Sequence, residues 1–212
     1  MQKVSENYER YISHYRALVK EGVLTGAPWL RERREEAISM FSGIGLPTER
    51  RGNEKWKYTN IGPLARTEFS LTGSDSPASL DIDSLRSLAP WHKDWPTLVF
   101  VDGVYSDALS SNINGKQEGV WFGTLAAALE DLDQQRLVEQ NLTTLASVEN
   151  DGFASLNTAF LADGAFLNIG EGQSIDRPLH MVFVSSGVAG RNVSHPRVLI
   201  IAGAGSKASI IE

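Results

Sequence analysis

The stretch GLPTERRGNEKWKYT, from Gly45 to Thr59, places a turn, a charge cluster and two aromatic residues in one short run. Gly45 and Pro47 should end a preceding helix, because glycine tolerates the left-handed backbone of a helix end and proline cannot extend the hydrogen-bond ladder. Trp56 and Tyr58 lie two residues apart, the period of an extended segment that buries one face. We interpret them as anchors that pin a loop to the core. The alternative is a docking surface for a partner.

Helical spacing indicates two amphipathic helices within residues 1–43. In the first, apolar residues recur every three or four positions, at Tyr8, Tyr11, Ile12, Tyr15, Leu18 and Val19. The second should begin near Pro28, a favourable first-turn residue, and end before Gly43. It should bury four residues, which are Trp29, Ala37, Met40 and Phe41. Packing against the rest of the domain is a more common use of such faces than partner binding.

The middle of the chain mixes strand and helix patterns. Apolar runs at Thr97–Val101 and Val104–Leu109 flank Asp102-Gly103, a dipeptide that supplies the positive backbone angles of a tight turn, so a β-hairpin is predicted near 97–109. Thr124 has the character of an N-cap, and helical spacing continues from there through Leu145. A further helix is predicted over Phe153–Leu161, so helices occupy much of residues 124–161.

After Gly164 the pattern changes to short apolar runs separated by glycine, proline, asparagine and serine. These runs are Ala165–Ile169, Leu179–Ser185, Arg197–Ile201 and Ala208–Ile211. Composition alone leaves a sandwich, a sheet or a solenoid open. The sequence therefore predicts an α+β fold with an N-terminal mixed α/β region over residues 1–164 and a strand-rich region over residues 165–212.

Four stretches, in order along the chain, are similar to the SufB/SufD family of iron–sulfur assembly proteins. They are GLPT…WKYT, LVFVDGVYSDALS (98–110), FASLNTAFLADGAFLNI (153–169) and HPRVLIIAGAGSKASIIE (195–212). The first is the most specific and fits the SufD branch, although Gly52-Asn53 within its charged linker departs from the pattern. The resemblance implies that residues 165–212 form the first coils of a parallel β-helix. Because Glu212 ends a strand-like run, we expect a truncated fragment.

The resemblance implies a function without catalysis: a scaffold subunit of the cytosolic SUF complex. Its implied partners are a SufB-like subunit, paired through the β-helix, and a SufC-like ATPase, docked on a C-terminal helical region. Both surfaces would lie mainly beyond Glu212, and a second copy of the chain is a further candidate partner. The complex handles an iron–sulfur cluster, and its ATP binds the SufC-like subunit. No catalytic, cofactor-binding or metal-binding residue is therefore assigned to this chain.

Composition restricts the chemistry. The 212 residues contain no cysteine, so thiolate nucleophiles, thiolate metal sites and persulfide acceptors are excluded from this chain. Residues 1–58 carry 11 Lys and Arg against 8 Asp and Glu, whereas the remainder carries 9 against 18, which argues against nucleic-acid binding. The polar start and the lack of a long apolar run predict a cytoplasmic protein with no membrane segment.

Two patterns favour other classes of function. Residues Gly203–Ala208, GAGSKA, follow a strand-like run and satisfy the dinucleotide-binding pattern G-x-G-x-x-A, so a nucleotide-binding enzyme is the alternative. That pattern requires a helix starting at the glycines, and a tight turn between strands is the more common use. A carbohydrate-binding β-protein could use three tryptophans, Trp91, Trp95 and Trp121.

The remaining polar candidates indicate no reaction. The four histidines, His14, His92, His180 and His195, have no metal-ligand spacing, so each is interpreted as structural or solvated. Two carboxylate pairs, Asp81 with Asp83 and Asp131 with Asp133, lie in polar surroundings. Without an apolar pocket to separate their pKa values, they offer no acid–base pair.

Overall fold

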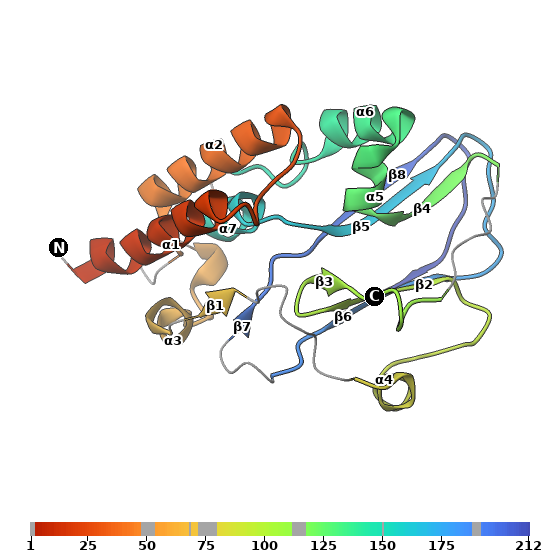
Figure 1. Cartoon of the computed structure of the whole chain (residues 1–212), viewed down its shortest axis with the longest axis horizontal. Coiled ribbons are helices and arrows are strands. Elements are labelled where there is room, and N and C mark those ends of the chain that lie inside the picture. The colour runs from red at the N-terminus through yellow and green to blue at the C-terminus, as the bar shows by residue number, and fades with distance from the viewer. Residues whose placement is uncertain are drawn as a thin grey trace. The chain divides into compact units, whose positions relative to one another are not determined.

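The computed structural model describes residues 3–47, 54–67, 69–71, 80–111, 118–149, 151–187 and 192–212. The helices are α1 Lys3–Lys20, α2 Pro28–Ile44, the 3₁₀ turn η1 Glu54–Trp56, α3 Gly62–Arg66, α4 Ile82–Leu88, α5 Leu125–Glu130, α6 Leu132–Asn141 and α7 Gly152–Ala159. The strands are β1 Ser70–Leu71, β2 Thr97–Val101, β3 Val104–Tyr105, β4 Val120–Thr124, β5 Gly164–Ile169, β6 Leu179–Val184, β7 Asn192–Val193, β8 Arg197–Ala202 and β9 Ile210–Ile211. These helices and mixed sheets confirm the predicted α+β fold (Figure 1).

The chain divides into two compact units, each built from two segments. Unit 1 comprises Met1–Glu68 and Glu139–Ala162, and unit 2 comprises Phe69–Val138 and Asp163–Glu212. The sequence-based boundary at residue 164 and the assignment of residues 165–212 to β-helix coils stay predictions. Among the described helices, none combines the length and apolar character that crossing a membrane requires.

Unit 1 is a helical body in which α2 packs against both α7 and α1 (Figure 1). Tyr11 and Tyr15 of α1 are buried as the spacing predicts, with Tyr11 edge-on to Phe41 at 5.4 Å between ring centroids and Tyr15 edge-on to Phe160 at 6.0 Å. Val19, which was expected on the same face, is 46% exposed. Edge-to-face contacts of this kind add to the stability gained by burying aromatic area. Phe160 follows α7, so the rings of α1 hold the second segment of unit 1.

Helix α2 begins and ends where the sequence predicts. Pro28 occupies its first turn, and Gly45 follows it with φ 69°, where its N–H donates to the Phe41 carbonyl at 2.8 Å. The positive φ explains why glycine stands at this position. Ala37 and Phe41 are fully buried, but Trp29 and Met40, which were also expected to be buried, are only half-buried.

Arg34, also on α2, is a buried cation that the helical pattern does not reveal. Its side chain is 2% exposed, its Nε donates to the Leu161 carbonyl at 2.9 Å, and its Nη1 donates to the Thr25 carbonyl at 2.6 Å. Burial lowers the pKa of Arg34 to about 10, so the guanidinium is still charged at neutral pH. Arg34 therefore links α2 to the segment before it, at Thr25, and to the segment after α7, at Leu161.

In the described part of unit 2, two sheets enclose an apolar core. One sheet has the order β3-β2-β6-β9 and the other β4-β5-β8, and a short parallel pair joins β1 to β7. The core between the sheets consists of buried side chains from β2, β5 and β6, which are Leu98, Phe100, Ala165, Leu167, Ile169, Leu179 and Met181. Helix α5 packs on β4 and β5 (Figure 1). Leu85 of α4 packs against the second face of β2, so that this strand is buried on both faces.

Parallel pairing connects strands that are far apart in the sequence. Strand β5 pairs with β8 from Gly164–Arg197 to Ile169–Ala202, and β6 pairs with β9. Strand β2 pairs in parallel with β6 over all five of its residues. The sequence predicted one antiparallel contact, the hairpin of β2 and β3. This hairpin forms around Asp102 at φ 50° and Gly103 at φ 86°. The Asp-Gly signal therefore identified the turn correctly.

Three further expectations need correction. The second hairpin arm ends at Tyr105 rather than Leu109, because the chain turns there and Ser110 N–H donates to the Ser106 carbonyl at 3.0 Å. The helical pattern through Leu145 is wrong beyond Asn141, since Thr143 has φ 75° and Leu145 is 99% exposed. The predicted extended segment at Trp56–Tyr58 is a 3₁₀ turn followed by a hydrogen-bonded turn.

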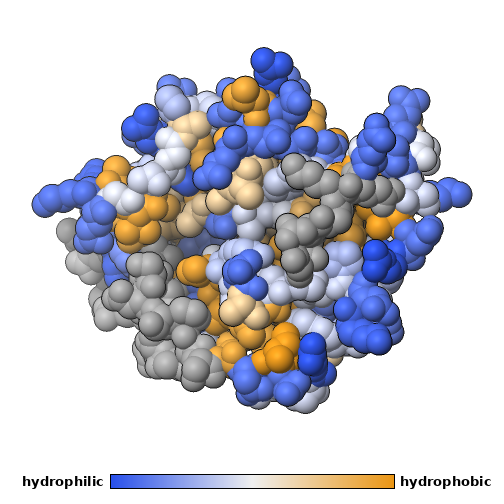
Figure 2. Space-filling view, turned by 45° about the vertical axis from the view of Figure 1, so that its right-hand side comes forward, coloured by the Kyte–Doolittle hydropathy of each residue, from blue (hydrophilic) through white to orange (hydrophobic). Residues whose placement is uncertain are grey.

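Apolar residues also reach the surface. On the face drawn in Figure 2, they form several separate groups among hydrophilic residues. The most exposed large apolar side chains of the described residues are Leu145 at 99%, Tyr58 at 92%, Leu88 at 83% and Leu132 at 76%. Isolated exposed apolar residues are normal on folded proteins, so each needs a second observation before it indicates function.

Candidate functional site

The turn after η1 presents two aromatic side chains in opposite ways. Trp56 is half-buried, and its ring lies 5.1 Å from that of Phe153 on α7. Tyr58 is 92% exposed, with Lys57 Nζ 5.6 Å from its ring centroid. The Thr59 N–H donates back to the Trp56 carbonyl at 3.0 Å, which closes the turn and breaks the alternation that an extended strand would show. The anchor interpretation therefore fits Trp56, and Tyr58 is left to face solvent.

Helix α3 follows this turn in the sequence. Asn60 Oδ1 accepts a hydrogen bond from the Gly62 N–H at 2.8 Å, an arrangement that starts the short helix. Residues 55–67, KWKYTNIGPLART, include three cationic residues and no carboxylate. Lys55, Lys57 and Arg66 are exposed, and Leu64 is 38% exposed. Arg66 and Leu64 were not singled out from sequence, although the lack of any acidic residue across this stretch was visible there.

We expect Trp56 and Tyr58 to differ sharply when each is replaced with alanine. Trp56→Ala removes a ring packed on Phe153 and should cost about 2 kcal/mol of unfolding free energy. Tyr58→Ala removes an exposed ring and should change stability by less than about 0.5 kcal/mol. Urea denaturation followed by circular dichroism measures both values. Equal losses would show that Tyr58 is also a core anchor.

His180 on β6 is the one histidine of the described chain that is deeply buried. It is 2% exposed, and its ring lies edge-on to Trp91 at 5.1 Å and to Trp95 at 5.7 Å. Its Nδ1 lies 3.3 Å from the Thr97 hydroxyl oxygen. Desolvation by burial lowers the pKa of His180, so the neutral ring is favoured in the folded state. Of the two interpretations left open by the sequence, structural or solvated, the burial of His180 favours the structural one.

Acidification should therefore destabilise unit 2 through His180. Its pKa is lower in the folded protein than in the unfolded chain, so the unfolded state binds the proton first and stability falls as the pH drops below about 6.5. The fall in unfolding free energy from pH 7.5 to pH 5.0 should be smaller in His180→Phe than in the unchanged protein. An equal fall in unfolding free energy in His180→Phe and in the unchanged protein would contradict the assignment.

The other histidines lie apart from His180. His14 is edge-on to Phe160 at 6.1 Å, and His92 is half-exposed with its Nδ1 3.7 Å from Asp94 Oδ2. His195 precedes Pro196 between β7 and β8. Within the part of the chain that the structure describes, no three His, Asp or Glu side chains gather in a way that could hold a metal ion.

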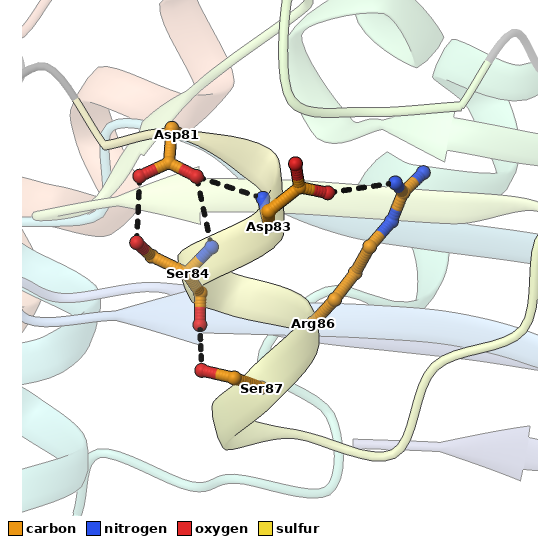
Figure 3. Close-up of polar contacts among 5 residues, drawn as sticks. All are labelled: Asp81, Asp83, Ser84, Arg86 and Ser87. Atoms are coloured by element: carbon orange, nitrogen blue, oxygen red, sulfur yellow. Dashed lines mark hydrogen bonds and ion pairs between the residues drawn. The ribbon is translucent and has the colours of Figure 1, made fainter.

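The paired carboxylates cap helices. Figure 3 shows Asp81 at the start of α4, where Oδ1 accepts from the Asp83 and Ser84 N–H groups at 2.9 Å each and Oδ2 accepts from the Ser84 hydroxyl at 2.6 Å. The Ser84 hydroxyl is the main cause that lowers the pKa of Asp81. Asp83 instead pairs with Arg86 at 3.1 Å. Asp131 caps α6 in the same way, by accepting from the Asp133 and Gln134 N–H groups.

The glycine pattern Gly203–Ala208 forms a turn and not the start of a helix. Gly205 has φ 69°, and the chain passes directly to β9. The turn stacks on an earlier one, because the Lys207 N–H donates to the Gln173 carbonyl and the Lys207 carbonyl accepts from the Ile175 N–H, both at 2.8 Å. A dinucleotide site needs a helix N-terminus at these glycines. The nucleotide-binding alternative therefore lacks its main structural requirement.

The three tryptophans of the carbohydrate alternative do not form a common platform. Trp91 and Trp95 contact His180, whereas Trp121 lies on β4 and packs on Phe166 of β5 at 5.1 Å. All three are half-buried. Their rings are used for packing within unit 2, and this leaves the exposed surface at residues 55–67 as the candidate functional site.

Comparison with known proteins identifies the family. The sequence model of the SufBD protein N-terminal region matches residues 2–181. The chain belongs to the SufBD family. This SufBD match includes three of the four stretches that carried the resemblance, and residues 195–212 lie outside it. The candidate surface at residues 55–67 falls inside the matched region.

Two curated proteins match most of this SufBD chain. The iron–sulfur cluster assembly protein SufD of Escherichia coli (strain K12) is 30% identical over 186 residues, which cover 84% of this chain and 37% of that protein. An iron–sulfur cluster assembly SufBD family protein of Synechocystis sp. is 24% identical over 202 residues, which cover 92% of this chain and 42% of that protein. The chain thus spans less than half the length of both relatives.

Proposed function

We propose that this chain is the N-terminal part of a SufD-like scaffold subunit, without catalytic activity of its own, in a cytoplasmic iron–sulfur cluster assembly complex. The observation that carries the proposal is the match to Escherichia coli SufD along 84% of the chain. The chain contains no cysteine and so offers no thiolate ligand to a cluster. Sulfur transfer and cluster ligation would then belong to other subunits or to residues outside this chain.

The proposal includes a fold for the strand-rich end, in which residues 165–212 are the first coils of a parallel β-helix. Three parallel contacts support it. Strand β8 lies on β5, β9 lies on β6, and an isolated parallel bridge joins Ser174 to Lys207 between them. Each of these contacts joins one strand–turn–strand run to the next, which is how the coils of a solenoid stack.

In this proposal the partners are a SufB-like subunit and a SufC-like ATPase, which binds the ATP of the complex. Stacked coils give a rigid body on which a second β-helical subunit can pair, and such a body transmits movement from an ATPase to the site of cluster assembly. This chain would contribute the start of that body and, through unit 1, a surface for further contacts. A second copy of the chain is the competing partner.

The scaffold role can be tested by co-expressing the tagged full-length protein with SufB-like and SufC-like subunits from the same genome. We expect a stable complex on size exclusion with light scattering, and iron and acid-labile sulfide in the purified material. Omission of the tagged subunit should abolish the complex. A full-length protein that purifies alone as a stable monomer or homodimer in the presence of both candidates would overturn the scaffold role.

A further inference from the structure

Unit 1 contains a cavity of about 320 Å³ that is open to solvent, and we call it the α2 cavity. Four of its lining residues are on α2 and the fifth is near the end of α6: Trp29, Glu32, Arg33, Glu36 and Glu139. The four on α2 follow the spacing i, i+3, i+4 and i+7, which places them on one face of the helix. The cavity and the helical spacing therefore agree that these side chains lie together.

The lining of the α2 cavity carries an excess of negative charge. Three carboxylates stand against one guanidinium, which leaves two negative charges. The guanidinium is already used, because Arg33 Nη1 lies 3.1 Å from Glu36 Oε2 and both side chains are about half exposed. Within the described part of the chain, the exposed Glu32 and Glu139 have no hydrogen-bond or ion-pair partner. The net charge of the cavity therefore rests on these two residues.

Nearby cations outside the cavity do not cancel this charge by direct pairing. Arg31 projects from the opposite side of α2, about 200° around the helix from Trp29. Arg34 is 2% exposed and donates to two backbone carbonyls inside unit 1. Arg136, one turn before Glu139 on α6, does not line the cavity. The α2 cavity thus keeps its negative character in its own surroundings.

Trp29 contributes an aromatic ring and an unmet hydrogen-bond donor. The face of an indole ring attracts ammonium and guanidinium groups, so the ring and the carboxylates favour the same kind of occupant. Trp29 Nε1 is buried and has no hydrogen-bond partner among the described residues. Buried donors without a partner are rare in native proteins. An unmet donor on a residue that lines a cavity points to an acceptor that the free chain lacks.

These features together select one class of occupant. It must bring a cation for the carboxylates and the ring, and an acceptor for the indole N–H. A lysine or arginine within a peptide offers both, through its side chain and its backbone carbonyl, whereas a polyamine has no acceptor. A small ligand usually needs an enclosing pocket that buries most of its surface, and the exposed lining of the α2 cavity does not provide one. A partner protein covers its own side chain.

We propose that the α2 cavity receives a lysine or arginine side chain from a basic segment of a partner protein, held between Glu32, Glu139 and the ring of Trp29. This inference deepens the scaffold role and rests on it, because a scaffold acts by holding other proteins. Carboxylates around the cavity attract basic segments and select against acidic ones. Binding should therefore weaken as the salt concentration rises.

The test uses the full-length protein with the photoreactive residue p-benzoylphenylalanine in place of Arg33, irradiated in cells and analysed by mass spectrometry. Position 33 lines the cavity and its side chain is 54% exposed, so the replacement reaches the occupant without entering the core. Loss of the Arg33 charge leaves the cavity more negative, which favours the proposed occupant. We expect a cross-linked peptide from another protein in which Lys and Arg outnumber Asp and Glu.

Two double variants that remove the same charge separate the cavity from the rest of the surface. Glu32→Gln with Glu139→Gln keeps the shape of the lining and should lower the cross-link yield about fivefold or more. Glu21→Gln with Glu35→Gln changes exposed carboxylates outside the cavity and should leave the yield within about twofold, because solvent and salt screen them. An equal fall in both variants contradicts the proposal.

Other results would also overturn it. They are no cross-link, or cross-links only to nucleic acid, to a second copy of this chain or to a peptide without basic excess. The SufB-like and SufC-like subunits, purified from the same cells, keep this proposal distinct from the scaffold role. If the complex is intact and the expected cross-link is absent, the cavity proposal alone fails. If the complex is missing while the full-length protein keeps its usual level, the scaffold role fails.

Discussion

Replacing Gly152 with alanine should cost at least about 3 kcal/mol of unfolding free energy, which makes it one of the most damaging small substitutions in unit 1. A Cβ at Gly152, the first residue of α7, would stand 1.9 Å from the carbonyl oxygen of Gly45 and 2.9 Å from its carbonyl carbon. Both atoms belong to backbone at the end of α2, so no side-chain rotation relieves the overlap. Helix α7 would have to move away from α2.

Gly43→Ala in α2 is the matched control for this prediction. A Cβ at Gly43 meets nothing within 4 Å, and glycine inside a helix is less favourable than alanine. The same substitution should therefore stabilise the protein, by up to about 1 kcal/mol. Urea denaturation of both variants measures the two opposite effects. A loss below about 1 kcal/mol in Gly152→Ala would mean that the two helices can separate without cost, and that this contact does not hold unit 1 together.

Arg34→Leu should cost about 3 kcal/mol, the second large effect that we expect. Leucine keeps much of the apolar stem but leaves the Leu161 and Thr25 carbonyls without the two donors that now reach them at 2.9 Å and 2.6 Å. Hydrogen bonds from a charged group contribute roughly 1.5–3 kcal/mol each. Relief from burying the guanidinium offsets part of this loss, because desolvation is the main cause that lowers its pKa.

The neighbouring Arg33 provides the control. Its side chain is 54% exposed and pairs with Glu36 at 3.1 Å, so Arg33→Leu should change the unfolding free energy by less than about 0.5 kcal/mol. Arg34→Lys should fall between the two leucine variants, since an ammonium keeps the charge but cannot reproduce the forked geometry. Thermal and urea unfolding of all three variants would check the order. Equal effects for positions 33 and 34 would contradict the buried role of Arg34.

Local signals in the sequence predicted much of the fold. Gly45 marked the end of α2, Asp102-Gly103 marked the hairpin turn, and Thr124 capped α5, where its hydroxyl accepts from the Ala127 N–H. Each depends on backbone geometry within a few residues, which residue type alone can specify. The helical spacing beyond Asn141 failed because the chain turns at Thr143, which has φ 75°, so that Leu142 is still buried but Leu145 faces solvent.

Features that depend on contacts between residues far apart in the sequence could not be predicted from local patterns. Arg34 resembles its exposed neighbours on α2, and only the approach of Leu161 makes it a buried donor. The helices α3 and α4 were missed because their runs are short, and strand β4 was missed although it is as long as β2. At the candidate site, sequence placed Trp56 and Tyr58 together but could not separate their roles. The distinction depends on Phe153, which meets Trp56 only in the folded unit.

The buried strand β2 has a consequence for synthesis on the ribosome. All five of its residues are buried, and Thr97 meets its partner His180 across a separation of 83 residues. At translation rates of about 5–20 residues per second, the nascent chain carries this apolar strand without its β6 partner for roughly 4–17 seconds. Throughout that interval β2 is an exposed, aggregation-prone segment to which nascent-chain chaperones can bind. Slow codons between residues 101 and 179 would lengthen its exposure and favour aggregation.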